Sequence, residues 1–434
     1  MEKQGKASAL LPIIVFLVLF LGVGGITGDF NNIPAIAAFL VALSVAFLQN
    51  RNVGFNDKMK LAAKGVGDEN VIIMCLVFLA AGAFSGAVTA AGGRDSTVNF
   101  CLSILPPGVA VMGLMLIGCF ISLSMGTSMG TISALAPIAV GISEKTGFPM
   151  VLCMGAVVSG AMFGDNLSMI SDTTIAATRT QGCEMKDKFR ENFKIVLPAA
   201  IVALVLYGVM TMGRDVVLEE SYAYNVFQIL PYLVVLIGAL AGVNVFIILI
   251  GGTILSLIVG VATGTIALPE LFVGMGSGIN GMYDITVISI VVACIVALVK
   301  NNGGIDYLLS FIRRKIKGET GGEFGIAVLT LLVDMATANN TIAIVMAGPI
   351  AKEISDEYGI SAKRTASLLD IFASVGQGLI PYGAQILLAA SFTELSPVEI
   401  VPYTFYPMLM GVSALIFIFF IKGKKKVKSK GKSY

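Results

Sequence analysis

Apolar runs of the kind that form membrane-crossing helices recur along the whole chain and are separated by short polar stretches. The clearest runs are Leu10–Leu21, Ile33–Leu48, Val71–Ala91, Val226–Leu240, Val245–Ala262 and Pro402–Ile421. A helix of about 20 apolar residues spans a hydrocarbon core of about 30 Å. We therefore expect an all-α, polytopic membrane protein.

The two halves of the chain repeat one pattern. A shift of 212 positions superimposes similar residues, for example Pro137–Ala139 on Pro349–Ala351, Gly147 on Gly359 and Gly164 on Gly376. A collinear match of this length predicts a duplication of the whole unit. The predicted divisions are a first repeat at 1–213, which contains the motif 164–174, a linker at 214–225, a second repeat at 226–422 and a basic tail at 423–434.

Basic residues mark opposite sides in the two halves. The connection 51–64 carries four Lys or Arg and its counterpart 263–280 none, whereas 92–105 carries one and 303–317 carries four. The connection 179–194 carries five, and its counterpart 391–402 none. Because basic connections stay on the cytoplasmic side, the repeats should have inverted topology, with about seven spans each. We expect a bacterial inner (cytoplasmic) membrane location, both termini cytoplasmic and the linker extracytoplasmic.

Two predicted spans of each half are irregular. In the first half they are Gly126–Ile142, which contains Pro137, and Met150–Thr178, which we expect to break at Gly164-Asp165-Asn166. Their counterparts are Ala338–Ile354, with Pro349, and Leu368–Ala390, with Gly376-Gln377-Gly378 and Pro381. Interrupted helices at corresponding places in inverted repeats are typical of secondary transporters, whose site lies where the breaks meet.

The polar residues at these irregular spans are the candidate site. A hard cation such as Na⁺ prefers carboxylate, amide, hydroxyl and carbonyl oxygens. The predicted cation ligands are Asp165, Asn166, Ser168, Asp172 and Thr173. The predicted substrate or coupling residues are Thr127, Ser128, Asp334, Asn339, Asn340, Thr341 and Gln377.

Buried carboxylates also predict proton coupling. Carboxyl groups close together in a low-dielectric region hold protons more tightly, so H⁺ and Na⁺ can compete for one site near neutral pH. The chain has no histidine, which leaves carboxylates and lysines as proton carriers. Structural roles stay open: Asp165 and Asp172 could cap a half-helix, and Asp334 and Asp370 could pair with Lys or Arg. Thr127, Ser128, Asn339 and Asn340 could instead bond across helices or satisfy the backbone groups freed at the breaks.

Composition removes several other classes of function. Only 13% of the residues are charged, the net charge is +2, and the lysines of the tail suit anionic lipid better than nucleic acid. Six cysteines show no metal-type spacing, so they suit apolar packing. We expect a transporter and not an enzyme, with no cofactor, with Na⁺ and H⁺ as partners and with the lipid bilayer around it. A homodimer is left open.

The stretch Gly164-Asp165-Asn166-Leu167-Ser168, followed by Ser171-Asp172-Thr173-Thr174, resembles the signature GDNLSPLSDTT of the NhaC family of Na⁺/H⁺ antiporters. Gly182-Cys183 and the basic stretch Lys186–Arg190 fit its continuation, while Met169-Ile170 replaces the usual Pro-Leu. The resemblance implies Na⁺ coupling, with H⁺ or an organic solute moving in the opposite direction. The alternative to Na⁺/H⁺ antiport is a Na⁺-coupled carrier of an amino acid or small carboxylate. A gated channel explains the paired irregular spans less well.

Overall fold

The computed structural model describes residues 5–27, 34–104, 106–169, 171–212, 223–313 and 316–421. These residues form helices and connecting turns, and none of them lies in a strand, so the predicted all-α class is confirmed. Most of the predicted linker, 214–222, and the basic tail 423–434 lie outside the described residues.

The first half folds into helices α1 to α10. They are α1 (Leu11–Thr27), α2 (Ala35–Leu48), α3 (Phe55–Val66), α4 (Glu69–Ala90), α5 (Gly93–Ile104), α6 (Ala110–Met125), α7 (Ser128–Thr146), α8 (Met150–Leu167), α9 (Asp172–Gln181) and α10 (Met185–Thr211). Short 3₁₀ turns lie at Ala7–Leu10 and Pro107–Val109.

The second half repeats this order as α11 to α21. They are α11 (Val226–Leu240), α12 (Val245–Ala262), α13 (Val273–Gly281), α14 (Tyr283–Asn301), α15 (Gly304–Arg313), α16 (Gly318–Thr337), α17 (Asn340–Tyr358), α18 (Ala362–Leu379), α19 (Ala384–Ser391), α20 (Pro397–Ile400) and α21 (Phe405–Phe419). Further 3₁₀ turns lie at Leu268–Glu270 and Val401–Tyr403. Helices α7 and α8 have 19 and 18 residues, as do their counterparts α17 and α18.

Not every helix is long enough to be a span. By length and hydropathy, seven helical stretches of the described chain could cross a membrane, or eight if the bent pair Pro397–Tyr403 and Phe405–Phe419 is one span. Four further apolar helices are shorter. Helices α3 and α15 occupy stretches that we predicted as connections, because their apolar residues lie on one face only, as Ala62 of α3 does. The chain is thus multi-pass, with additional amphipathic helices.

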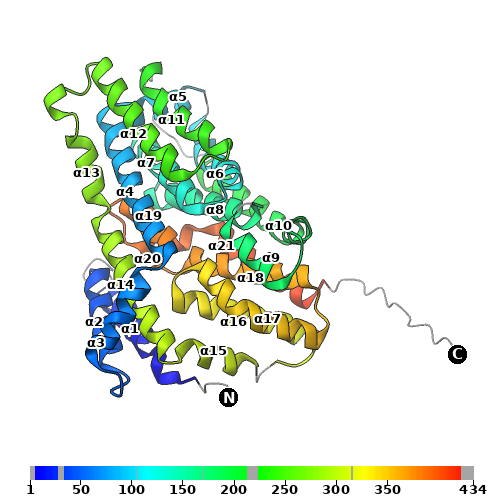
Figure 1. Cartoon of the computed structure of the whole chain (residues 1–434). Helices are drawn as coiled ribbons and strands as arrows, with labels where there is room; N and C mark the ends of the chain where they lie inside the picture. The colour runs from blue at the N-terminus through cyan, green and yellow to red at the C-terminus, as the bar shows by residue number, and fades with distance from the viewer. Residues whose placement is uncertain are drawn as a thin grey trace.

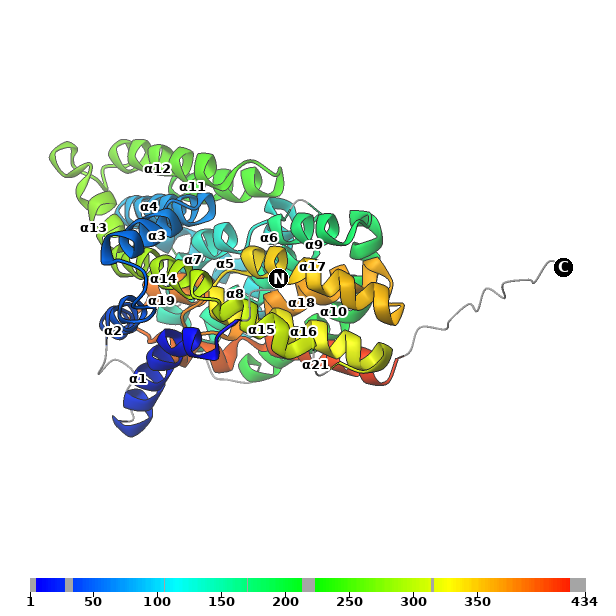
Figure 2. The ribbon, with the colours of Figure 1, turned by 60° about the horizontal axis from the view of Figure 1, so that its bottom comes forward.

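Helices of the two halves exchange partners. Helix α4 of the first half packs against α12 and α13 of the second half. In the same way, α14 of the second half packs against α2 and α3 of the first. Helix α9 likewise packs on α17, and α19 packs on α7. Figures 1 and 2 both show α4 beside α12 and α13, with α16, α17 and α18 together at the other end of the molecule. The crossing of α4 and α13 is glycine-lined: a Cβ on Gly86 would lie 2.1 Å from the carbonyl oxygen of Gly274. Small residues allow this backbone contact.

The broken helices form the centre of the molecule. In the stretches Met150–Gln181 and Ala362–Ser391, 83% and 89% of the most apolar 18-residue segment is buried inside the protein, whereas the value for α12 is 44%. Large apolar side chains on α10 and α12, such as Val209 and Ile258, are exposed at 68% and 60%. Such outward apolar faces suit contact with lipid tails. Most of the polar motif 164–174, including Asp165 and Asn166, is therefore in the protein interior, away from these outward apolar faces.

Candidate functional site

Both central helices are interrupted, but not at the residues that we predicted. Helix α8 continues through Gly164-Asp165-Asn166 and ends at Leu167, and α9 begins at Asp172. Likewise, α18 continues through Gly376-Gln377-Gly378 to Leu379, and α19 begins at Ala384 after Pro381. The predicted break points are therefore wrong by a few residues.

Gly164 and Gly376 allow close packing between helices and do not interrupt α8 and α18. A Cβ on Gly164 would lie 2.3 Å from the backbone nitrogen of Leu123 on α6. The matching Cβ on Gly376 would lie 2.2 Å from Oδ2 of Asp334 on α16. A Cβ at Gly164 would clash with backbone, and a Cβ at Gly376 would displace the Asp334 side chain, so both glycines allow the end of a broken helix to pack against its neighbour.

The short helices α7 and α17 begin at sharp turns beside these breaks. Gly126 ends α6 with φ +67°, and its counterpart Ala338 ends α16 with φ +49°, a left-handed conformation that costs a residue with a Cβ roughly 1–2 kcal/mol. Thr127 accepts the Gly130 N–H at 3.5 Å, and Asn339 accepts the Ile342 N–H at 2.9 Å. Both side chains thus cap a half-helix, which is the structural role left open for them.

Asp165 is the centre of a buried hydrogen-bond cluster. Its side chain accepts the Ser128 hydroxyl at 2.8 Å and the Ser171 hydroxyl at 2.6 Å, and the residue is 5% exposed. The Ser171 and Thr173 hydroxyls are 2.9 Å apart, and the Gln385 amide donates to Ser128 at 3.1 Å. The cluster joins α7, α8 and α9 of the first half to α19 of the second. Neither carboxylate oxygen caps a helix through these bonds.

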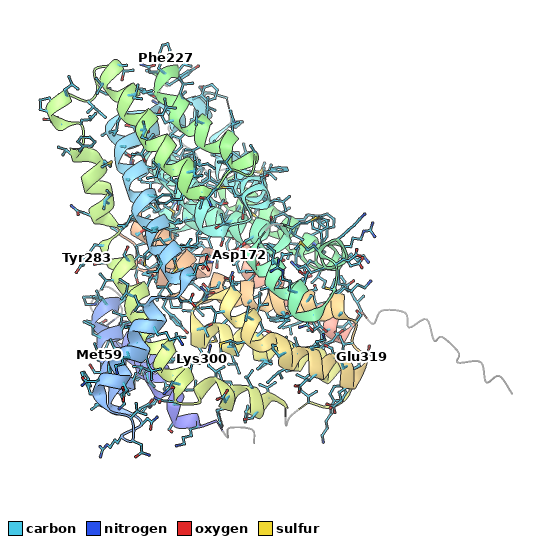
Figure 3. The ribbon with its side chains drawn as sticks, viewed as in Figure 1. Met59, Asp172, Phe227, Tyr283, Lys300 and Glu319 are labelled. Atoms are coloured by element: carbon cyan, nitrogen blue, oxygen red, sulfur yellow. The ribbon has the colours of Figure 1, made fainter. Side chains whose placement is uncertain are left out.

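A cavity of about 140 Å³ adjoins this cluster and brings both halves together. Eight of the predicted residues line it together with Ser171 and Gln385: Ser128, Asp165, Asp172, Thr173, Asn339, Asn340, Thr341 and Gln377. Thr127, Asn166, Ser168 and Asp334 are not among its described lining residues. Asp172 is exposed in the first turn of α9, near the middle of the molecule (Figure 3).

The ends of four helices meet at the cavity. Its lining includes the first-turn residues Ser128 of α7, Asp172 of α9, Asn340 of α17 and Gln385 of α19. A helix N-terminus carries roughly half a positive charge, which favours nearby anions. The two carboxylates of the cavity, Asp165 and Asp172, thus lie among the N-terminal ends of several helices.

Three amides of the cavity have unused hydrogen-bonding atoms. Gln377 donates to Asp334 at 3.1 Å and Gln385 donates to Ser128, but the Oε1 atom of each glutamine and the Nδ2 atom of Asn340 have no partner. Asp334 is fully buried behind Gln377, and its Oδ2 is also without a partner. Buried polar atoms without partners are costly. They suit an ion or solute that completes their bonding.

Asn166 belongs to a separate network on the far side of α8. Its backbone carbonyl accepts the Lys188 ammonium at 2.7 Å and the Asn192 amide at 3.1 Å. Lys188 also contacts Thr174 and forms an ion pair with Asp370. The pairing of Asp370 with a basic residue is the structural role left open for it. We did not predict Lys188 or Asn192, which lie one helical turn apart on the buried face of α10.

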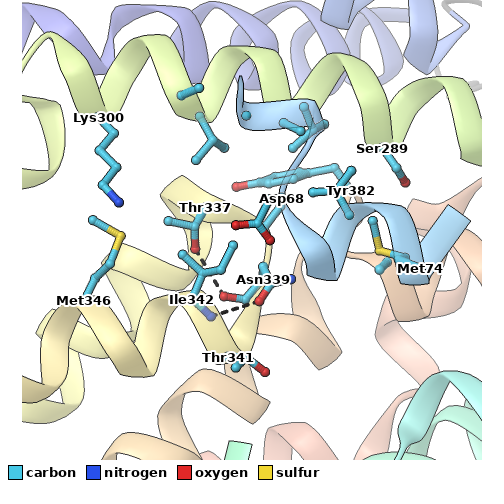
Figure 4. Close-up of a pocket in the computed structure, with 18 of the residues that line it drawn as sticks. Asp68, Met74, Ser289, Lys300, Thr337, Asn339, Thr341, Ile342, Met346 and Tyr382 are labelled. Carbon is cyan, nitrogen blue, oxygen red and sulfur yellow. Dashed lines mark hydrogen bonds between the residues drawn. The ribbon is translucent and has the colours of Figure 1, made fainter. Parts of the chain in front are cut away.

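A wider cavity of about 620 Å³ reaches the same site from one end of the molecule. It shares Met74, Ala338, Asn339, Thr341 and Ala384 with the small cavity. Its other lining residues include Lys64, Asp68 and Lys300. Figure 4 shows Lys300 on α14 across the opening from Asn339 and Thr341. The wide cavity thus extends from the site toward Lys64, at the end of the basic connection 51–64.

The chemistry of the small cavity is that of a hard-cation or polar-solute site. Its polar atoms are carboxylate, hydroxyl and amide oxygens, which bind alkali and alkaline-earth cations rather than soft metals. In the described part of the chain, no group of three or more His, Cys, Asp or Glu side chains could hold a metal ion. The oxygens instead come mainly from hydroxyls and amides.

Comparisons with known proteins find a family model and several transporters that are similar to this chain. The model of the Na⁺/H⁺ antiporter family matches residues 10–212 and 222–422. The malate-2H⁺/Na⁺-lactate antiporter of Bacillus subtilis is 21% identical over 92% of this chain and 92% of its own length. The Na⁺/H⁺ antiporter NhaC of Alkalihalophilus pseudofirmus is 22% identical, with 89% of each chain covered. The arginine/ornithine antiporter ArcD of Halobacterium salinarum is 22% identical over 96% of this chain and 92% of its own.

Proposed function

Because this chain belongs to the Na⁺/H⁺ antiporter family, we propose that it exchanges Na⁺ for H⁺ at Asp165 by alternating access. The family and its named relatives are membrane transporters, so the chain is a multi-pass secondary transporter and not an enzyme. The resemblance of the 164–174 motif to the NhaC signature agrees with this assignment.

The observation that carries the proposal is the environment of Asp165. A buried carboxylate, two serine hydroxyls and a glutamine amide from both halves adjoin a cavity of about 140 Å³. When Asp165 is ionised, the hydroxyls of Ser128 and Ser171 donate to it; they can rotate and turn their oxygens toward a bound Na⁺. When Asp165 is protonated, the site loses the charge that holds the cation. The carboxylate of Asp165 therefore binds either Na⁺ or H⁺, but not both at once.

Thr173 and Asp172 complete the proposed site. Thr173 lies 2.9 Å from Ser171 through its hydroxyl, and Asp172 stands at the exposed rim of the cavity. We assign Thr173 as a further oxygen ligand and Asp172 as the charge that attracts cations into the cavity. Asn166 and Ser168, which the sequence also predicted as ligands, fix the end of α8 in this proposal.

Alternation follows from two repeats of opposite orientation. The exchanged contacts of α4 with α13 and of α14 with α3 support a two-fold relation between the halves. The wide cavity opens beside Lys64 and Lys300, on the side that basic residues mark as cytoplasmic. We infer that this conformation faces the cytoplasm, with both termini there, and that a bundle movement closes it and opens the opposite side of a bacterial inner membrane.

A second candidate function is Na⁺-coupled transport of a small carboxylate or amino acid. Four helix N-termini meet at the small cavity, and helix N-termini favour carboxylate groups. The unpaired amide atoms of Gln377 and Asn340 could bond such a solute, and the wide cavity of about 620 Å³ exceeds what a bare ion requires. The names of two relatives include malate, lactate, arginine or ornithine.

Transport by the purified protein separates these functions. We would reconstitute it in liposomes with an acidic interior and follow internal pH with a trapped dye. Addition of Na⁺ alone should collapse the pH gradient in the wild type and leave it intact in Asp165→Asn. An intact gradient together with Na⁺-dependent uptake of radiolabelled malate, lactate or arginine would establish the second function. An intact gradient without Na⁺-dependent uptake of any of these solutes would contradict both.

A further inference from the structure

Lys188 occupies a site that has the composition of a cation site. Its ammonium, on a side chain 1% exposed, bonds three oxygens: the carbonyl of Asn166 at 2.7 Å, the hydroxyl of Thr174 at 2.9 Å, and Oδ2 of Asp370. The other oxygen of Asp370, Oδ1, is buried and has no partner. One carbonyl, one hydroxyl and one carboxylate are the ligands that a hard cation prefers.

The position within the fold also favours a cation. Asn166 is in the last turn of α8, just before the break, where the free carbonyls of a half-helix carry the negative end of its dipole. Transporters with broken helices use such carbonyls for their coupling ions. Here the carbonyl is bonded to a lysine that reaches it from α10.

The other half of the chain shows that the fold does not require this ion pair. With the shift of 212, Asp370 matches Val158, Thr174 matches Ile386 and Lys188 matches Ile400. These three residues are fully buried in the hydrophobic core, where α8 packs against α19 and α20. The same architecture is thus built once with apolar side chains and once with a lysine and an aspartate. A buried ion pair has no general stability advantage over apolar packing, so a purely structural role does not explain it.

We propose that Lys188 is a tethered cation that permanently fills a second Na⁺ site formed by the Asn166 carbonyl, Thr174 and Asp370. The ammonium supplies the positive charge and the contacts that a free ion would supply, and it joins α8 and α9 of one half to α18 of the other. Only the cation at Asp165 would then exchange during transport. This last statement rests on the proposed function, whereas the existence of the second site does not.

The proposal predicts that removal of the lysine opens the site. In Lys188→Ala, the three oxygens and the charge of Asp370 remain, and the shortened side chain leaves space for an ion. Purified Lys188→Ala should bind one more radiolabelled Na⁺ per chain than the wild type. Its melting temperature in detergent should also rise more than that of the wild type when choline is replaced by Na⁺, because a ligand that binds only the folded state stabilises it.

Two control variants separate ion binding from general effects. Lys188→Ala with Asp370→Asn keeps the space but removes the charge, so the additional Na⁺ and the additional Na⁺-dependent stabilisation should both disappear. Lys188→Ile with Asp370→Val copies the residues that the chain uses at the equivalent place. Replacing choline by Na⁺ should raise its melting temperature by the same amount as it raises that of the wild type.

The outcomes distinguish the second site from the proposed function. Equal Na⁺ binding by Lys188→Ala and the wild type would overturn the tethered-cation proposal, and so would a Lys188→Ala protein that does not fold even in high Na⁺. If the wild type binds no Na⁺ and Lys188→Ala binds one, the second site is established while Na⁺ binding at Asp165 is refuted. If the wild type binds one Na⁺ and Lys188→Ala binds two, the second site and Na⁺ binding at Asp165 are both supported.

Discussion

The substitution Asp165→Asn removes one negative charge from the proposed site and changes the side-chain volume very little. In the wild type, the carboxylate accepts hydroxyl hydrogen bonds from Ser128 at 2.8 Å and from Ser171 at 2.6 Å. An asparagine at this position can accept one of these bonds and donate to the other serine, because a hydroxyl both donates and accepts. We therefore expect the variant to fold and to insert as the wild type does.

The loss of cation binding should be large. Two unit charges about 4 Å apart attract each other by about 4 kcal/mol at an effective dielectric constant of about 20, which is typical of partly buried sites. This energy corresponds to about three powers of ten in affinity. Asp172 remains at the rim of the cavity and restores part of the attraction. We expect Na⁺ affinity to fall roughly 100- to 1000-fold in Asp165→Asn.

The assay is Na⁺-dependent proton movement in liposomes, recorded over a wide range of Na⁺ concentrations, with the melting temperature in detergent as a control for folding. Asp172→Asn is the matched variant, because its side chain is exposed and its attraction for the ion is weakened by solvent. We expect its half-saturating Na⁺ concentration to rise by roughly tenfold or less. If Asp165→Asn transports with a half-saturating concentration close to that of the wild type, Asp165 is not the cation ligand and the reasoning is refuted.

Three further predictions concern the helices around the site and are tested by thermal unfolding in detergent. Gly164→Ala should destabilise the protein by about 1–3 kcal/mol, because its Cβ would lie 2.3 Å from backbone on α6, whereas Gly113→Ala on α6 meets open space and should have no such cost. Asn339→Ala should cost about 1 kcal/mol for the lost cap, and Thr127→Ala less, because its capping bond is 3.5 Å long. Ala338→Gly should stabilise by about 1 kcal/mol, since φ is +49° there; an unchanged melting temperature would show that the turn is not strained.

The sequence predicts the outline of the site because duplication repeats it. The shift of 212 identifies both interrupted helices and both short helices, and eight of the predicted residues meet at one cavity together with neighbours from the same segments. The residues of each break are less well predicted. Gly164 and Gly376 resemble helix breakers in a sequence, but their lack of a side chain serves contact with α6 and α16. Only the distance between helices distinguishes these roles.

The ion pair of Lys188 and Asp370 was missed for a related reason. Lys188 lies among five basic residues at 179–194, which we interpreted together as a cytoplasmic connection. Helix α10 begins at Met185, and its helical period places Lys188 and Asn192 on the face that also buries Ile195 and Ala199. A polar residue on an otherwise apolar helical face is the signal that could have revealed it. Its partner on α18 is 182 positions away, which no local pattern reports.

The amphipathic helices α3 and α15 were also interpreted as connections. Their mean hydropathy is too low for a membrane span, although the apolar residues of each gather on one face. In α3, Lys58 is 6% exposed and donates to the carbonyls of Phe47 and Gln49 at the end of α2. A lysine can thus satisfy the last carbonyls of a neighbouring helix. Charge counts along the chain do not separate loops from surface helices.

Competition between Na⁺ and H⁺ at Asp165 is the central claim, and equilibrium binding tests it most directly. Radiolabelled Na⁺ binding to the purified wild type would be measured at a series of pH values, with the number of bound ions and the apparent affinity determined at each. We predict one bound Na⁺ at every pH and, in the acidic range, an apparent dissociation constant that rises about tenfold for each unit of falling pH, because one proton must leave for one ion to bind. An affinity for Na⁺ that does not change with pH would contradict the claim.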